Sequence, residues 1–253
     1  METWEHCKLS TFSRTVAECI KKAGFEVEGM ILEPLAAGEA VLTQSEKKLG
    51  VLLIDLGGES TTTAVFVNGN VIGARVLAVG ANQITVDIAG KFHIPMSVAE
   101  QLKREHGCAM TSLAKEASVA LPAEEGAARN RIPRQNLAEV IQHRVESIFS
   151  LVRREVEGTR FPRGVGESVV LTGGGALLEG ITKLAHQKFA LPVRMGKPDG
   201  RVEGWGKLVN SPAYSTVTGL LPCGLNKRGL TEISGMGWQG PITKVKNWIR
   251  EFF

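Results

Sequence analysis

Cysteine is scarce in this sequence of 253 residues, which contains only Cys7, Cys19, Cys108 and Cys223, none of them in a CxxC pair. A chain this long, with 43% hydrophobic residues, can build a core without a disulfide framework, so we expect a reducing compartment. The five histidines show no HExxH or similar spacing, and the sequence therefore indicates no zinc site.

Long apolar runs and a strong charge imbalance are also missing. No apolar run reaches the ~18 residues of a membrane-spanning helix, and residues 1–10 lack the basic and apolar order of a signal peptide. The net charge is +4, which is too mild to indicate nucleic acid as a partner. The hydrophobic content excludes a disordered chain, and the length predicts one or two domains.

Alternating helical and strand-like periodicity predicts an α/β fold. We expect helices at 11–24, 34–42, 82–92, 97–106, 134–157, in a segment ending at 189, and at 215–221. We expect strands at 27–32, 49–54, 63–67, 71–79, 118–121, 168–172 and near 193. Ser97 and Glu100 have the spacing of a capping box at a helix start.

The strongest local signal is a buried strand that ends in Asp55 and is followed by the turn LGGESTTT (56–63). Glycine lets backbone N–H groups approach an anion, hydroxyls add donors, and the carboxylate of Asp55 suits Mg²⁺ held through water. An ordinary hairpin capped by an aspartate explains this stretch equally well.

A second signal combines an apolar strand, the turn TGGG (172–175) and a helix. Such a unit places bare backbone and a helix N-terminus against a phosphate or a nucleoside. The signal is weak alone because many α/β turns share it.

The end of the chain changes character. Residues 222–240 are rich in glycine and read as a flexible linker. Residues 241–253 follow as an amphipathic helix with apolar positions Ile242, Val245, Trp248, Ile249, Phe252 and Phe253. This helix is too short to span a bilayer but suits the membrane interface; docking on its own domain is the alternative.

In this order, the two glycine turns resemble the actin-like ATPase superfamily, and the whole chain resembles the FtsA family of bacterial division proteins. The resemblance also includes ILEPLAA (31–37), AEQLKREHGCA (99–109), LAEVI (137–141), YSTVTGLL (214–221) and the terminal helix. It implies an actin-like (ribonuclease H-like) ATPase fold. Residues 1–46 would end the first lobe and 47–221 would form the second lobe, with core and outer subdomains.

The resemblance further implies ATP and Mg²⁺ as cofactors. The second phosphate loop of the family corresponds to Asp55, Gly57, Gly58, Ser60 and Thr61, with Asp55 holding Mg²⁺ through water. The adenosine loop corresponds to Gly173, Gly174 and Gly175, and the pair beside ribose and base to Glu100 and Lys103.

The implied partners are the C-terminal tail of FtsZ, membrane lipid and further copies of the chain in a polymer. Arg144 is the expected contact for the acidic tail, and Glu146 a weaker one. The implied location is the cytoplasmic face of the inner membrane at the division septum, as a peripheral protein.

Two residues depart from the family pattern: Glu59 stands where a third glycine is usual, and Thr62 where an aspartate is usual. A carboxylate near the phosphates repels them, so we expect at most a weak ATPase. Nothing here matches the family's first phosphate loop and inserted subdomain, and we therefore expect a truncated form or a fragment.

Three alternatives remain. A sugar or polyphosphate kinase relative of the same superfamily would need a catalytic base, for which Asp55 is the only candidate, and would leave the tail unexplained. A rod-shape filament protein of the MreB type would carry its membrane element near the N-terminus. A non-functional fragment is the third.

Overall fold

The computed structural model describes residues 11–115, 117–120, 131–158, 167–198 and 209–226. Contacts divide the chain into two compact units, of which one is Leu32–Arg228. The other comprises Met1–Ile31 and Gly229–Phe253, and only residues 11–31 of it are described. Helix α1 (Thr11–Lys22) lies in that unit, as predicted. It ends where Gly24 takes φ +87° and Phe25 N–H bonds back to the Ile20 carbonyl, a common helix stop.

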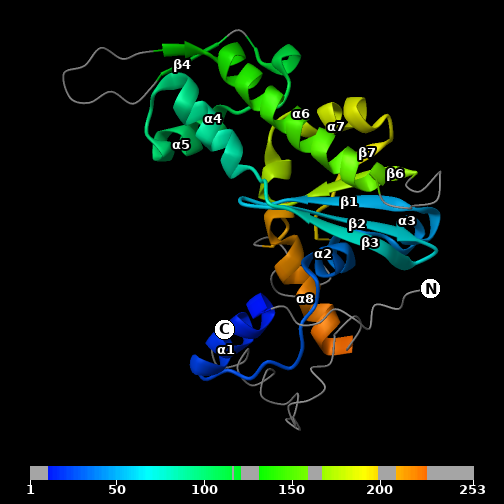
Figure 1. The fold of residues 1–253 in the computed structure, drawn as a ribbon. Helices are drawn as coiled ribbons and strands as arrows, with labels where there is room; N and C mark the ends of the chain where they lie inside the picture. The colour runs from blue at the N-terminus through cyan, green and yellow to red at the C-terminus, as the bar shows by residue number, and fades with distance from the viewer. Residues whose placement is uncertain (1–10, 116, 121–130, 159–166, 199–208, 227–253) are drawn as a thin grey trace. The chain divides into compact units, whose positions relative to one another are not determined.

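A five-stranded sheet forms the centre of the Leu32–Arg228 unit, in the order β3-β2-β1-β6-β7 (Figure 1). Its strands are β1 (Val51–Leu56), β2 (Thr61–Val67), β3 (Asn70–Leu77), β6 (Ser168–Thr172) and β7 (Val193–Met195). The first three are antiparallel, whereas β1, β6 and β7 run parallel. The carboxyl ends of β1 and β6 therefore meet at one edge of the sheet, where the two glycine turns begin.

The remaining elements surround this sheet. They are the helices α2 (Glu33–Val41), α3 (Gln44–Leu49), α4 (Asn82–Phe92), α5 (Met96–His106), α6 (Arg134–Gly158), α7 (Ile181–Phe189) and α8 (Ser215–Asn226). The short 3₁₀ turns are η2 (Thr111–Leu113), η3 (Gly174–Leu177) and η4 (Pro212–Tyr214). Strands β4 (Ser118–Ala120) and β5 (Arg131–Pro133) pair antiparallel in a separate small sheet.

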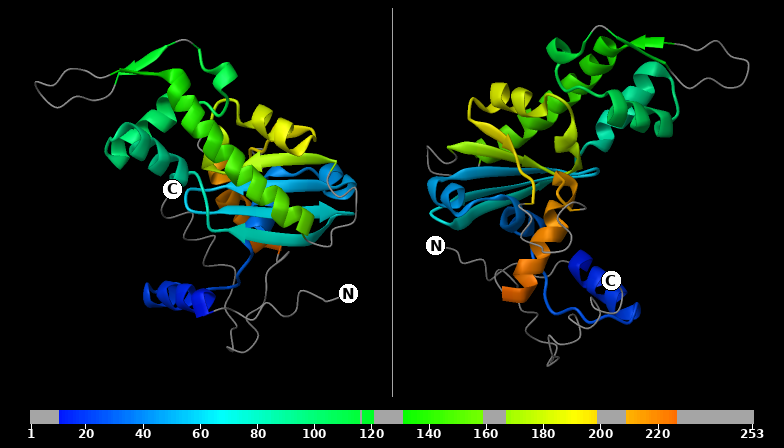
Figure 2. Two further views of the ribbon diagram at one scale, coloured as in Figure 1. Left: turned by 45° about the horizontal axis from the view of Figure 1, so that its top comes forward. Right: turned by 180° about the vertical axis from the view of Figure 1, so that it is seen from behind.

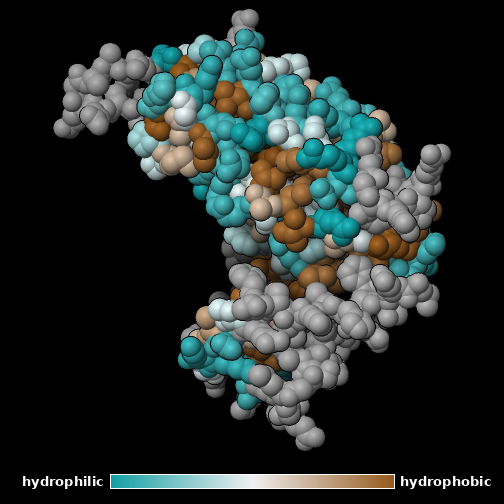
Figure 3. Space-filling model, viewed as in Figure 1, coloured by the Kyte–Doolittle hydropathy of each residue, from teal (hydrophilic) through white to brown (hydrophobic). Residues whose placement is uncertain are grey.

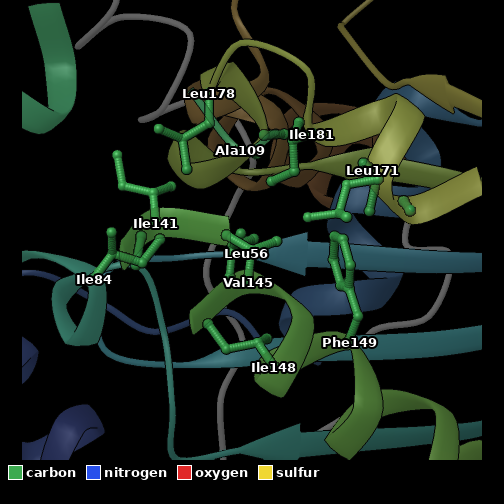
Figure 4. Packing of buried hydrophobic residues seen from close by; sticks show 14 of the residues in the cluster. Leu56, Ile84, Ala109, Ile141, Val145, Ile148, Phe149, Leu171, Leu178 and Ile181 are labelled. Atoms are coloured by element: carbon green, nitrogen blue, oxygen red, sulfur yellow. The ribbon is translucent and has the colours of Figure 1, made fainter. Parts of the chain in front are cut away.

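Each face of the central sheet carries its own apolar core, because successive strand residues point to opposite faces. On one face Leu56 and Leu171 pack with the α6 residues Val145 and Phe149 (Figure 4). On the other, Leu53, Ala64, Phe66 and Val170 pack with α2. Figures 1 and 2 show α6 and α7 on the first side of the sheet and α2 and α8 on the second.

Two local predictions are wrong. Residues 27–32 form no strand: Met30 makes only an isolated bridge, and none of the described strands pairs along this segment. The capping box of Ser97 and Glu100 is also absent: α5 starts after Pro95 and has no side-chain cap. The Glu100 carboxylate instead accepts a hydrogen bond from Thr85 at 2.6 Å and pairs with Lys103.

The second half of the unit extends the predicted elements. Strand β5 lies in a stretch for which the sequence analysis predicted no strand, and residues 121–130 before it are outside the described part. Helix α8 continues through Pro222 to Asn226, four residues past the predicted start of the linker. Residues 33–46 belong to the same compact unit as the sheet, so the assignment of 1–46 to a first lobe stays a prediction.

Candidate nucleotide-binding site

Asp55 lies at the carboxyl end of β1 with only 5% of its surface exposed. It pairs in register with Thr62 on β2 and Thr172 on β6, so all three side chains belong to the α2/α8 face. Burial and, to a smaller extent, the nearby charge of Glu33 raise the pKa of Asp55 to about 6, against the opposing effect of a hydrogen bond from Thr216 Oγ1 (3.4 Å). A cation beside this carboxylate would stabilise its ionised form.

The first glycine turn is closed on itself and tied to α4. Gly57 N–H donates to the Ser60 carbonyl at 3.0 Å. The carbonyls of Gly57 and Gly58 accept from the N–H groups of Ala81 and Asn82, both at 2.8 Å. The turn therefore keeps its shape through the start of α4.

Two side chains of this turn, Thr61 and Glu59, also form hydrogen bonds. Thr61 Oγ1 donates to the Val79 carbonyl at 2.7 Å, so this hydroxyl holds the hairpin in place. Glu59 is exposed and accepts a hydrogen bond from Asn82 Nδ2 at 2.5 Å. The carboxylate that departs from the family pattern is thus fixed at the N-terminal end of α4.

The second glycine turn touches the first. Gly173 has φ +85°, and a Cβ atom there would overlap Oδ1 of Asp55. A Cβ atom on Gly175 would overlap the side chain of Leu56, whereas Gly174 faces open space. Asp55, Gly57, Gly58, Gly173 and Gly175, predicted from two segments over 110 residues apart, therefore converge at one end of the sheet.

Glu100 and Lys103 lie on α5 and face α4. Lys103 is 7% exposed, pairs with Glu100 at 2.6 Å and donates to Thr85 Oγ1 at 2.8 Å and to the Ala81 carbonyl at 3.1 Å. Burial acts to raise the pKa of Glu100, but the hydrogen bonds from Lys103 and Thr85 and nearby positive charge outweigh it and lower the pKa. Because Ala81 also bonds to Gly57, Lys103 connects α5 to the first glycine turn.

The sequence analysis missed Glu33 at this site, and it named Thr62 only as a departure from the family pattern. Glu33 is the first residue of α2, and burial raises its own pKa; the motif EP at a helix start was the available signal. Thr62 is 2% exposed, and its hydroxyl is the one buried side-chain oxygen or nitrogen among the described residues that has no hydrogen-bond partner. This buried hydroxyl on the strand beside Asp55 has an unused hydrogen-bonding capacity.

The two predicted partner contacts point to different sides of α6. Arg144 forms a two-point ion pair with Asp87 of α4, at 2.5 and 2.8 Å. Glu146 accepts from Gln142 at 2.9 Å and lines an open pocket of about 640 Å³. The pocket is bounded by Thr111, Ser112, Gln135, Asn136, Glu139, Gln142, His143 and Glu146, and Arg144 is not part of it.

The other predicted contacts lie outside the described residues. These are Ile242, Val245, Trp248, Ile249, Phe252 and Phe253. Within the described part, no helix is long and apolar enough to cross a membrane, and no cluster of three or more metal-ligating side chains occurs.

The sheet order, the two touching glycine turns and the helices on both faces define an actin-like ATPase fold. MreB5 of Spiroplasma citri, in a crystal structure with ADP, aligns with a TM-score of 0.68 over 87% of this chain and 67% of its own, at 19% identity. The protein of the MamK double helical filament aligns with a TM-score of 0.64 over 86% of this chain and 66% of its own, at 13% identity.

Residues 52–219 match the family described as "Cell division protein FtsA", and the chain belongs to that family. The cell division protein FtsA of Pseudomonas aeruginosa is 34% identical over 95% of this chain, and that of Escherichia coli K12 is 33% identical over the same share. The chain spans about 60% of the length of both relatives.

Proposed function

We propose that this chain acts in bacterial cell division as a nucleotide-binding adaptor that tethers FtsZ to the cytoplasmic membrane. The observation that carries the proposal is the meeting of the two glycine turns at Asp55, in a chain of the FtsA family. The relatives are named as cell division proteins. The match to the FtsA family favours this proposal over the kinase-like and MreB-type alternatives.

The residues present fit a nucleotide with Mg²⁺. Gly173 lacks a side chain where a Cβ would fill the space beside Asp55, and Gly174 borders open space, so phosphate or nucleoside can approach the backbone. Asp55 would hold Mg²⁺ through water, and the ion would supply charge neutralisation for the phosphates. Gly57, Gly58, Ser60 and Thr61 would line the phosphate side, Gly173, Gly174 and Gly175 the adenosine side, and Glu100 with Lys103 would support the site from α5.

Hydrolysis is expected to be slow at most. Thr62 offers a hydroxyl where the family pattern has a carboxylate, and the fixed carboxylate of Glu59 adds negative charge near the first turn. If a second carboxylate takes part in hydrolysis, we propose Glu33, because its charge acts on Asp55. We therefore propose that ATP is chiefly a structural or regulatory ligand.

We propose that the acidic C-terminal tail of FtsZ docks on the outer helices. The first turns of α6 with η2 form the open pocket that includes Glu146, and Arg144 supplies the cation on the adjacent side of α6. In the pocket Gln142 Oε1 accepts from Thr111 N–H at 2.8 Å and from Thr111 Oγ1 at 3.1 Å, and a docked peptide backbone would compete for these groups. Figure 3 shows that the visible surface over these outer helices is largely hydrophilic.

We propose that residues 241–253 bind lipid and place the protein at the cytoplasmic face of the inner membrane, at the septum. Trp248 and Phe252 would insert, and Lys and Arg residues nearby would each add roughly 1 kcal/mol on an anionic surface. Self-association into polymers would combine many weak anchors, and such avidity can exceed one affinity by about 10² or more.

The test is co-sedimentation with anionic and with zwitterionic vesicles at low and high salt, with and without FtsZ. We expect the full chain to pellet with anionic vesicles and to bring down FtsZ, and a chain ending at Ser234 to stay in solution. The double variant Trp248→Glu, Phe252→Glu should behave like the shortened chain, whereas Asn247→Glu, off the apolar face, should still pellet.

Each part of the proposal fails on a different result. Equal sedimentation of the full and shortened chains would refute the proposed lipid-binding role of residues 241–253. If the chain pellets with vesicles but FtsZ stays in solution, the lipid anchor is supported and the proposed FtsZ-binding surface is refuted. Equilibrium dialysis with ATP and Mg²⁺ tests the nucleotide separately, and absence of binding would refute that part.

A further inference from the structure

Arg144 is the only Lys or Arg between Arg134 and Arg153 along α6. Its neighbours one turn away, at positions 140, 141, 147 and 148, are Val, Ile, Ser and Ile, all uncharged. An acidic segment that docks along this stretch of α6 therefore meets a single guanidinium. The state of that guanidinium decides how much charge attraction the surface offers.

In the structure this guanidinium is already occupied from within the molecule. Asp87 on α4 accepts from Arg144 Nε at 2.5 Å and from Nη2 at 2.8 Å, which is the two-point geometry that a partner carboxylate would use. The ion pair raises the pKa of Arg144. Helices α4 and α6 pack side by side within the outer part of the unit (Figure 1).

The pair is accessible to solvent rather than sealed. The side chain of Arg144 is 29% exposed and that of Asp87 23% exposed. Because both side chains keep contact with solvent, an incoming carboxylate can reach Arg144 and compete with Asp87 for it. Lys91 is exposed one turn after Asp87 on α4, and it offers Asp87 a second cation if Arg144 is drawn away.

We propose that Asp87 is an intramolecular competitor that occupies Arg144 in place of a carboxylate of the acidic partner segment. This inference rests on the proposed docking of the FtsZ tail. The attraction between partner and surface is then set by an exchange: the partner carboxylate gains Arg144 only when Asp87 releases it. Asp87 thereby lowers the affinity and the salt dependence of docking, and loss of its charge should raise both.

The test measures binding of a fluorescent synthetic peptide of the FtsZ C-terminal tail to the full chain by anisotropy, at two salt concentrations. Asp87→Asn keeps the size and hydrogen-bonding oxygen of the side chain and removes its charge. We expect Asp87→Asn to bind the peptide about threefold to fivefold more tightly at low salt and to lose more affinity at high salt. Glu105→Gln, which removes an exposed carboxylate from α5, is the matched control and should change affinity less than twofold.

The cycle with Arg144→Gln shows whether Asp87 acts through Arg144. In that background Asp87→Asn should have no effect, because the competed group is gone. Unchanged or weaker binding by Asp87→Asn, or an equal gain in the Arg144→Gln background, would overturn the inference while the docking proposal stands. If no form of the chain binds the peptide even at low salt, the docking proposal itself fails and the inference with it. Circular dichroism of each variant verifies the fold.

Discussion

Gly173 and Asp55 face one another across the carboxyl ends of β6 and β1, so closely that any Cβ atom on Gly173 would overlap Oδ1 of Asp55. Gly173 also has φ +85°, a conformation that residues with a side chain rarely adopt. Both features leave the backbone of the second glycine turn bare beside a buried carboxylate. This contact joins two sequence motifs into one site.

The first prediction concerns this glycine. Gly173→Ala should weaken binding of ATP at least tenfold and lower the free energy of unfolding by about 1–3 kcal/mol, because it adds backbone strain and a collision with Asp55. Gly174→Ala is the matched control, since Gly174 has no neighbour within 4 Å, and should retain stability. Equilibrium dialysis and thermal unfolding measure both effects, and equal behaviour of the two variants would contradict the role given to Gly173.

The second prediction is a pH dependence caused by Asp55. Its pKa of about 6 lies above the ordinary value of 3.8, so the folded state binds the proton more tightly than the unfolded state. The stabilisation from this proton is complete below pH 4 and is lost as the pH rises through 6. Asp55→Asn mimics the protonated form, and its advantage over the unchanged chain should grow between pH 4 and 7, by at most about 3 kcal/mol. Denaturant unfolding with a metal chelator present measures this difference; a constant advantage would refute the assignment.

The third prediction has the opposite sign. Arg194 holds Glu46 through two hydrogen bonds of 2.6 and 2.7 Å, and this contact lowers the pKa of Glu46 to about 2. The stabilisation is therefore present above pH 4.5 and is lost as the pH falls toward 2. Glu46→Gln should cost about 1 kcal/mol at pH 7, a value reduced for the partial exposure of the pair, and nothing near pH 2. Unfolding curves at both pH values test it, and an equal cost at both would contradict the ion-pair explanation.

Local sequence patterns predicted most of the fold because they depend on near neighbours. The alternation and runs of apolar residues identified β1, β2 and β6. Asn68 and Gly69, which join the predicted strands 63–67 and 71–79, adopt the φ values of +52° and +81° that suit a tight hairpin. The prediction of a strand at 27–32 was wrong because it used only local residues. Those residues favour a strand, but whether they pair depends on segments far away in the sequence.

The site was predictable only where a motif marks it. Glycines and Asp55 carried a recognisable spacing, whereas the ion pair of Arg144 with Asp87 joins residues 57 positions apart and has no local signature. The absent capping box shows the same limit, since the Glu100 carboxylate bonds to Thr85 of α4 as well as to Lys103 on its own helix. Glu33 could not be predicted as a site residue from the sequence, because its effect on the pKa of Asp55 depends on how α2 packs beside β1.

The last prediction concerns Glu59, whose carboxylate is fixed by Asn82 at the start of α4. If phosphates lie at the first glycine turn, this charge opposes them, and Glu59→Gln should bind ATP about fivefold more tightly. Gln keeps the contact with Asn82, so a gain shared by Glu59→Gln and Glu59→Gly would come from charge rather than from a loosened turn. Adenosine, which lacks phosphates, is the matched ligand and should bind all three forms alike. A gain for adenosine equal to that for ATP would show that Glu59 acts on the shape of the site and not on the phosphates.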